Sequence, residues 1–170
     1  MSMVRLRSPL TLSKVEVSKK TAVIGIGNTL RRDDGIGVMV LDSLLKFYKR
    51  EEADYFNFGS ASFDLLHRIK NYDAVLLIDG INANLAAGEL KIGKLEDIEY
   101  HLQARFTSTH ELNLKNIFEL SKKLDIKTTI YVAGIQVADT ALGEGLSETL
   151  KRKEEEITKK VSAFIDEVFI

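Results

Sequence analysis

The sequence contains no cysteine and no tryptophan, and only one proline in 170 residues. The missing cysteines exclude disulfides, thiolate metal sites, iron–sulfur clusters and a cysteine nucleophile. Any metal site or catalytic group in this chain must therefore be built from oxygen atoms and imidazole rings.

Long apolar runs and a surplus of charge of one sign are also missing. No segment approaches the roughly 20 consecutive apolar residues of a membrane-spanning helix. The first 20 residues are basic, but they lack the apolar centre of a secretory signal peptide. The 24 Lys and Arg residues nearly balance the 25 Asp and Glu residues, which disfavours binding to nucleic acid through its phosphates. We expect a cytoplasmic protein with no membrane or nucleic-acid partner, and a monomer as its oligomeric state.

The composition is that of one soluble globular domain, with 45% hydrophobic and 29% charged residues. A chain of this length buries about 70% of the surface that its unfolded form exposes, so it needs no cross-links. We expect residues 1–20 to form a basic N-terminal extension and residues 21–170 to form a single domain.

Apolar β-branched runs alternate along the chain with segments whose apolar residues recur every three or four positions. We expect strands at residues 21–27, 54–58, 74–79, 89–92 and 128–134, and helices at 34–50, 62–70, 108–124 and 147–169. The stretch that ends at residue 107 is expected to be irregular or briefly helical. This alternation predicts a single-domain α/β three-layer sandwich, with a mostly parallel open sheet of about five strands and helices on both faces. Ligands of such folds bind outside the carboxyl ends of the strands.

The segment from Gly25 to Gly37 leaves a predicted strand, enters a predicted helix and carries four glycines and two adjacent acids, Asp33 and Asp34. A dinucleotide-binding fingerprint would need a glycine where Leu30 stands, and the carboxylates would repel a pyrophosphate. A cation fits this segment better. The alternative is that Asp33 or Asp34 only caps the following helix.

Two further residues are expected at the same edge of the sheet. Asp79 ends a buried strand, where a carboxylate must be solvated, hydrogen-bonded or paired with a cation. The alternative there is an Asx turn with Gly80. His110 is expected in the first turn of a helix, within the capping box Ser108–Glu111, where the helix dipole keeps the imidazole neutral and able to bind a metal.

Asp34, Asp79 and His110 are all expected at the loop side of the sheet, where they can converge. Two carboxylates and one imidazole with open positions suit Zn, Ni, Fe or Mn, and the ligand types do not narrow this choice. The alternative is that the three residues only happen to have this spacing. Because we expect all three at an exposed rim, their substitution should leave the fold intact.

Several motifs together resemble those of the [NiFe]-hydrogenase maturation protease family. They are Gly25-Ile26-Gly27-Asn28-Thr29-Leu30, Asp33-Asp34-Gly35 followed by Gly37, Asp79 closing an apolar strand, Gly88-Glu89-Leu90, Thr109-His110 with Leu114, and Gly134-Ile135-Gln136. The resemblance runs from about Thr21 to the terminal helix. The chain departs from the family pattern at Asn57-Phe58-Gly59, at Gly80 and at Val137-Ala138-Asp139.

The resemblance implies a cytoplasmic endopeptidase that removes the C-terminal extension of a [NiFe]-hydrogenase large-subunit precursor after nickel insertion. It also implies that Asp34, Asp79 and His110 bind the nickel carried by that precursor, with no permanent cofactor. The sequence shows neither a legible Ser–His–acid arrangement nor a His-Glu-x-x-His motif. Hydrolysis would therefore use a water activated by a carboxylate or by a metal, with Asp34 and Asp79 as the candidate catalytic residues.

Other functions remain open at this point. The chain can be a relative that acts on another precursor, or one that has kept the three residues and lost activity. A non-catalytic module of the same fold, which binds a metal and assembles with a partner, is the alternative from a different class.

Overall fold

The computed structural model describes residues 19–60, 63–102 and 114–170. Five strands form one sheet in the order β2-β1-β3-β5-β4. Their bounds are Thr21–Ile26 for β1, Ala53–Gly59 for β2, Ala74–Ile81 for β3, Leu90–Lys94 for β4 and Thr129–Gln136 for β5. The first four strands in this order pair in parallel, and β4 runs antiparallel to β5 at the edge. The predicted α/β fold with a mostly parallel sheet is confirmed.

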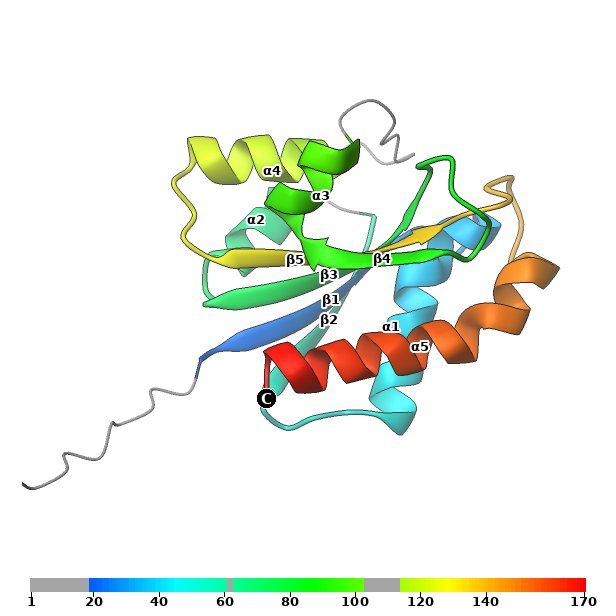
Figure 1. Ribbon diagram of the computed structural model, residues 1–170, viewed down its shortest axis with the longest axis horizontal. Helices are drawn as coiled ribbons and strands as arrows, with labels where there is room; N and C mark the ends of the chain where they lie inside the picture. The colour runs from blue at the N-terminus through cyan, green and yellow to red at the C-terminus, as the bar shows by residue number, and fades with distance from the viewer. Residues whose placement is uncertain (1–18, 61–62, 103–113) are drawn as a thin grey trace, which may run out of the picture.

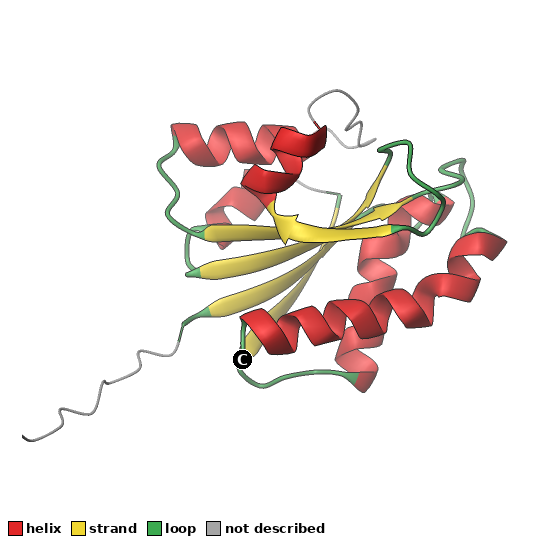
Figure 2. Ribbon diagram, viewed as in Figure 1, coloured by secondary structure: helices red, strands yellow, loops and turns green. Residues whose placement is uncertain are grey.

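The helices cover both faces of this sheet (Figure 1). Their bounds are Ile36–Phe47 for α1, Phe63–Ile69 for α2, Leu95–Leu102 for α3, Leu114–Lys123 for α4 and Glu148–Val168 for α5. Helices α1 and α5 lie on one face, while α2, α3 and α4 lie on the other, so the strands form the middle of three layers (Figure 2). A short 3₁₀ turn, η1, spans Arg32–Gly35 and leads into α1.

Strand β3 is the centre of the core, because all eight of its residues are buried. Val75 and Leu77 pack on the side of α2 and α4, whereas Leu76 and Ile78 pack on the side of α1 and α5. A strand covered on both faces needs apolar residues at odd and even positions alike. This double burial explains the unbroken apolar run in the sequence.

Two predicted helices differ from the observed ones in their details. The helix expected at 34–50 begins with the η1 turn and ends at Phe47. The helical spacing of Phe63, Leu66 and Ile69 predicts that these three residues share one face of the helix at 62–70. In α2, Leu65, Leu66 and Ile69 are buried, whereas Phe63 is 68% exposed. The predicted start of α4 at residue 108, with its capping box, lies outside the described residues. The same is true of most of the basic N-terminal extension.

The edge of the sheet and the terminal helix follow the sequence patterns more closely. Strand β4 forms at the edge where residues 89–92 predicted it, and the stretch after it forms α3. Ser147 begins α5 as predicted, since its hydroxyl accepts a hydrogen bond from the Leu150 amide at 3.5 Å. Among the described helices, none is long and apolar enough to span a bilayer.

Candidate functional site

Gly37, in the first turn of α1, sets the position of the glycine–acid segment. A Cβ atom at this residue would lie 2.2 Å from the carbonyl oxygens of both Ile26 and Ile78. These two residues lie near the carboxyl ends of the neighbouring parallel strands β1 and β3. Only glycine lets the start of α1 pack directly on both strands, and this packing brings the preceding acids to the same edge as Asp79.

Gly27 plays a similar part at the exit of β1. Its φ of 143° lies in a region that residues with a Cβ rarely adopt, and an added Cβ would lie 2.1 Å from the carbonyl oxygen of Asp34. The chain can therefore turn sharply after β1 and fold η1 back over its own strand end. Close packing of the backbone therefore explains why glycines stand at positions 27 and 37, although the segment lacks a dinucleotide-binding fingerprint.

Asp34 is buried at this turn, with 3% of its surface exposed. Its Oδ2 atom accepts a hydrogen bond from the backbone amide of Asn28 at 3.3 Å. Neither η1 nor α1 has a side-chain N-cap hydrogen bond, so the alternative that Asp33 or Asp34 caps this helix is wrong.

Asp79 is also buried, with 2% of its surface exposed. It lies inside β3, which continues to Ile81, so an Asx turn with Gly80 does not form. Because strand residues alternate between faces, its side chain points to the same side as Leu77 and Ile81, the side of α2 and α4. Its partner on β5 is Gly134, where an added Cβ would lie 2.8 Å from Cδ1 of Ile81.

The expectation that these two acids lie at an exposed rim is therefore wrong. Both side chains are covered, because η1 packs over the strand ends and β3 extends two residues beyond Asp79. The close approach of η1 to β3 is seen at Gly80, where an added Cβ would lie 3.2 Å from the carbonyl oxygen of Asp33. Asp34 and Asp79 thus belong to one packed edge formed by β1, β3 and η1.

Asp33 has a different role from its neighbour. It is fully buried, and its carboxylate accepts hydrogen bonds from the amides of Ala138 and Asp139, each at 2.9 Å, and from the amide and hydroxyl of Ser147, at 2.6 and 2.9 Å. These donors lie in the loop after β5 and at the start of α5. Asp33 therefore fastens η1 to the connection between β5 and α5, a role that the sequence analysis missed.

The backbone completes this attachment. Arg31 and Gly143 form an isolated parallel bridge, in which Gly143 donates to the Leu30 carbonyl and Arg32 donates to the Gly143 carbonyl, both at 2.9 Å. Arg32 has a φ of 44°, which is unusual for a residue with a side chain. Its guanidinium also forms an ion pair with Asp139 at 3.0 Å. Such strained backbone persists only where the surroundings fix it.

Gln136 holds the loop that follows β3. Its buried side chain accepts hydrogen bonds from the amides of Ala83 and Leu85, at 2.8 and 3.2 Å, and donates to the carbonyl of Val137 at 2.9 Å. The residue belonged to a motif of the family resemblance, but its type alone did not predict this role. Asp33 and Gln136 thus secure the two loops that flank the acidic edge.

The predicted three-residue metal site is covered by the structure only in part. Asp34 and Asp79 lie at the same edge, whereas His110 lies outside the described residues. Within the part of the chain that the structure describes, no group of three His, Cys, Asp or Glu side chains is arranged to hold a metal. The convergence of His110 with the two carboxylates stays a prediction.

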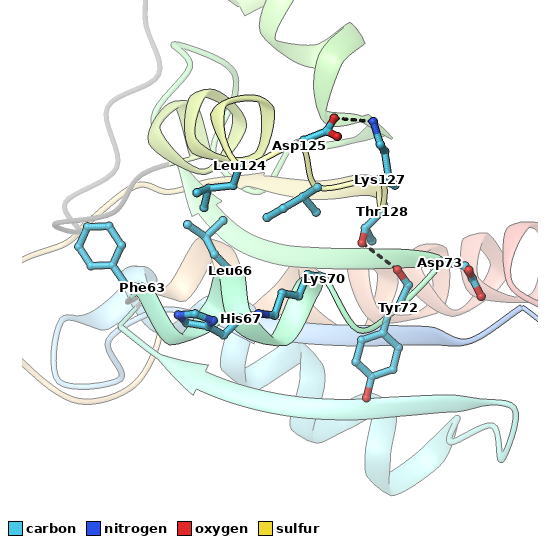
Figure 3. A pocket seen from close by; sticks show the side chains of 11 residues that line it. Phe63, Leu66, His67, Lys70, Tyr72, Asp73, Leu124, Asp125, Lys127 and Thr128 are labelled. Atoms are coloured by element: carbon cyan, nitrogen blue, oxygen red, sulfur yellow. Dashed lines mark hydrogen bonds and ion pairs between the residues drawn. The ribbon is translucent and has the colours of Figure 1, made fainter.

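An open groove of about 600 Å³ lies at the other end of the sheet (Figure 3). Its walls come from α2, from the residues before β3 and from the connection between α4 and β5. Thr128 is one of the lining residues, and its hydroxyl lies at hydrogen-bond distance from the carbonyls of Ile69 and Tyr72, at 2.9 and 2.7 Å. Since Tyr72 and Thr128 precede their strands, this groove is separate from the acidic edge.

Comparison with known proteins assigns the family. The profile of the hydrogenase maturation protease family HycI matches residues 38–163, a range that includes Asp79 and His110 and begins after Asp34. A putative hydrogenase maturation protease of Methanocaldococcus jannaschii is 32% identical over 138 residues, which cover 75% of this chain and 78% of that protein.

Solved structures agree in fold. The hydrogenase maturating endopeptidase HybD from E. coli has a TM-score of 0.75 and 24% identity, covering 87% of this chain and 93% of its own. The [NiFe] hydrogenase maturation protease HycI from Thermococcus kodakarensis has a TM-score of 0.68 and 26% identity, covering 89% and 95%. The extent of the family match and the identity to the archaeal relative place this chain in the hydrogenase maturation protease family.

Proposed function

We propose that this protein is an endopeptidase that removes the C-terminal extension of a [NiFe]-hydrogenase large-subunit precursor after nickel has been inserted. The proposal rests on family membership and on one structural observation. Asp34 on η1 and Asp79 on β3 are two buried carboxylates that belong to one packed edge at the carboxyl side of the sheet. This is the edge at which α/β sheets bind their ligands.

Asp34, Asp79 and His110 are the proposed contacts for the nickel of the precursor. Carboxylate oxygens and a neutral imidazole are ligands that nickel accepts. A set of three ligands is incomplete, so the isolated protein should bind nickel weakly and complete the coordination of an ion that the precursor brings. Cleavage would then depend on nickel insertion, and the protein would need no permanent cofactor.

Asp34 and Asp79 are also the proposed catalytic groups. The chain has no cysteine nucleophile, and a carboxylate can take the proton of an attacking water. Burial supports this role, because a carboxylate held away from bulk solvent interacts more strongly with a charge that develops beside it. The hydrogen bonds that Asp33 and Gln136 accept would keep the loops after β5 and β3 in place during the reaction.

The test is incubation of the purified protein with a nickel-loaded large-subunit precursor, followed by intact mass measurement. We expect the precursor to lose a C-terminal peptide. Asp34→Asn, Asp79→Asn and His110→Ala should each prevent the loss, whereas Asp42→Asn, an exposed position on α1, should not change it. If precursors bind but are never shortened, the protein is an assembly module rather than a protease.

A further inference from the structure

The groove between α2 and the connection from α4 to β5 exposes large apolar side chains. Phe63 is 68% exposed and Leu124 is 61% exposed, and both line this groove together with the buried Leu66. Figure 3 shows these three side chains gathered at one end of the groove, with Tyr72 and Asp73 at the other. A single exposed apolar residue is common, but two in one groove of about 600 Å³ are typical of a binding surface.

The N-terminal extension joins the fold directly beside this groove. Lys20, the last residue before β1, donates its amide to Asp73 Oδ2 at 2.8 Å, and its carbonyl accepts from the Asp73 amide, also at 2.8 Å. The Lys20 ammonium nitrogen lies 4.7 Å from the centroid of the Tyr72 ring. Because Tyr72 and Asp73 both line the groove, the chain that precedes Lys20 starts next to it.

The extension is long enough to enter the groove without any change in the fold. An extended chain spans about 3.3 Å per residue, so the ten residues before Lys20 reach up to about 33 Å. This reach is several times the width of a groove of about 600 Å³.

The sequence of the extension provides apolar side chains for the groove. Leu10 and Leu12 are separated by one residue, and so are Val15 and Val17. Residues spaced in this way point to the same side of an extended chain. Each pair thus presents two aliphatic side chains together, which suits the apolar end of the groove.

The charges around the groove are balanced. They comprise two carboxylates, Asp73 and Asp125, and two ammonium groups, Lys70 and Lys127. Residues 10–17 carry one lysine and one glutamate. A strongly acidic or strongly basic partner gains little from such a rim, whereas an apolar segment of mixed charge matches it.

The covalent connection favours this segment over a separate partner. A segment joined to its binding site by a short flexible linker has an effective concentration in the millimolar range. A separate peptide of similar composition has to compete with it at its own, lower concentration. The segment that is tethered at the rim of the groove is therefore the favoured occupant.

We propose that residues 10–17 of the N-terminal extension bind in this groove of the same chain, with their aliphatic side chains on Phe63 and Leu124. The extension then covers the apolar end of the groove. The inference does not depend on the proposed function, because the groove lies at the opposite end of the sheet from Asp34 and Asp79.

Engineered cysteine pairs test this proposal in the full chain, which has no cysteine of its own. Leu124→Cys is combined in turn with Leu10→Cys, Leu12→Cys, Val15→Cys and Val17→Cys. Each variant is oxidised, digested without reduction and analysed by mass spectrometry. We expect at least one of these pairs to form a disulfide within the chain in most molecules.

Glu52→Cys is the matched control for Leu124→Cys. Thr21 of β1 pairs with Ala53 on one side and with Ala74 on the other, so the exposed Glu52 also lies beside the end of the extension, across β1 from the groove. A freely moving extension would reach both cysteines. We expect at least about fivefold less disulfide with Glu52→Cys, because binding in the groove raises the local concentration only there.

Amide hydrogen exchange tests the proposal without new cysteines. Burial of two aliphatic side chains changes a local equilibrium more than about tenfold. We therefore expect residues 10–17 to exchange at least about tenfold faster in Phe63→Ser/Leu124→Ser than in the wild type. Leu142→Ser, 83% exposed on the loop after β5, should leave their exchange unchanged. If the double variant does not fold, Leu124→Ser alone keeps the comparison.

The outcomes decide between the possible occupants of the groove. Equal exchange of residues 10–17 in the wild type and the groove variant would overturn the inference, and so would equal disulfide yields with Leu124→Cys and Glu52→Cys. Disulfides that form only between molecules, or protection that disappears on dilution, would also overturn it and would assign the groove to a second copy of the chain.

Discussion

The Asp33 carboxylate accepts two hydrogen bonds from Ser147, one from its amide at 2.6 Å and one from its hydroxyl at 2.9 Å. Ser147 is the N-cap of α5, so this contact joins the acidic turn after β1 to the terminal helix, 114 residues later in the chain. The two adjacent acids therefore divide their work. Asp33 holds the turn in place, whereas Asp34 is the residue proposed for the site.

This division predicts a large effect of Asp33→Ala on stability. The carboxylate is fully buried and accepts four hydrogen bonds, which would all lose their acceptor. Bonds to charged groups contribute about 1.5–3 kcal/mol each, so a loss of about 3 kcal/mol or more in the free energy of unfolding is expected. Urea denaturation measures it. Glu155→Gln, in an exposed ion pair, should change the same quantity by less than about 1 kcal/mol.

Asp34→Asn and Asp79→Asn should reduce cleavage of the precursor by a factor of about 10² or more, because a neutral amide cannot take a proton from water. Asparagine has nearly the same shape, so circular dichroism of both variants should match the wild type even though the positions are buried. A variant with wild-type cleavage would remove that residue from the proposed site.

Gly37→Ala tests how α1 reaches the strand ends. The new methyl group would lie 2.2 Å from the Ile26 and Ile78 carbonyl oxygens, so the helix start must move. Overpacking of this kind costs about 1–3 kcal/mol, and we expect a lower free energy of unfolding together with reduced cleavage. Gly93→Ala is the control, since its nearest contact would be an ordinary 3.6 Å. Equal stability of the two variants would contradict the packing described at Gly37.

The raised pKa of Tyr72 predicts that the free energy of unfolding falls at alkaline pH. Burial, and then its hydrogen bond to Asp54 at 2.7 Å, raise the pKa of Tyr72 from 10.0 to about 12. A group with a raised pKa stabilises the folded state fully below its unfolded pKa and loses this contribution as the pH rises through the folded value. The stabilisation should therefore fade between pH 10 and about 12.

Tyr72→Phe removes the hydroxyl that titrates. At pH 7 it should lower the free energy of unfolding by about 1 kcal/mol, the usual value of one hydrogen bond. Between pH 10 and about 12 the difference from the wild type should shrink, which denaturation at several pH values measures. A constant difference over this range would show that the tyrosine does not titrate as described.

The sequence patterns predicted the strands and most helices because these depend on local periodicity. The apolar run from Ala74 to Asp79 predicted a strand covered on both faces, and Ser147 predicted the start of α5. They also placed Asp34 and Asp79 at one edge of the sheet, because parallel strands end together. Phe63 was misplaced because helical spacing indicates a shared face but not whether a neighbour covers all of it.

The parts that sequence reasoning missed are contacts between distant segments. No local sequence feature distinguishes Asp33 from Asp34. Only the hydrogen bonds from the loop after β5 show that Asp33 is the residue that fastens η1. Burial of Asp79 was also missed, because the continuation of β3 to Ile81 depends on its pairing with β5 up to Gln136. The residue types of Gly80 and Ile81 do not by themselves predict this pairing.

Nickel-dependent cleavage is tested by comparing a nickel-loaded large-subunit precursor with its nickel-free form, each incubated with this protein and analysed by intact mass. Only the loaded form is expected to lose its C-terminal extension, and His110→Ala is expected to abolish this loss. Equal cleavage of both forms would contradict nickel recognition by Asp34, Asp79 and His110. Absence of cleavage of either form would contradict the protease itself.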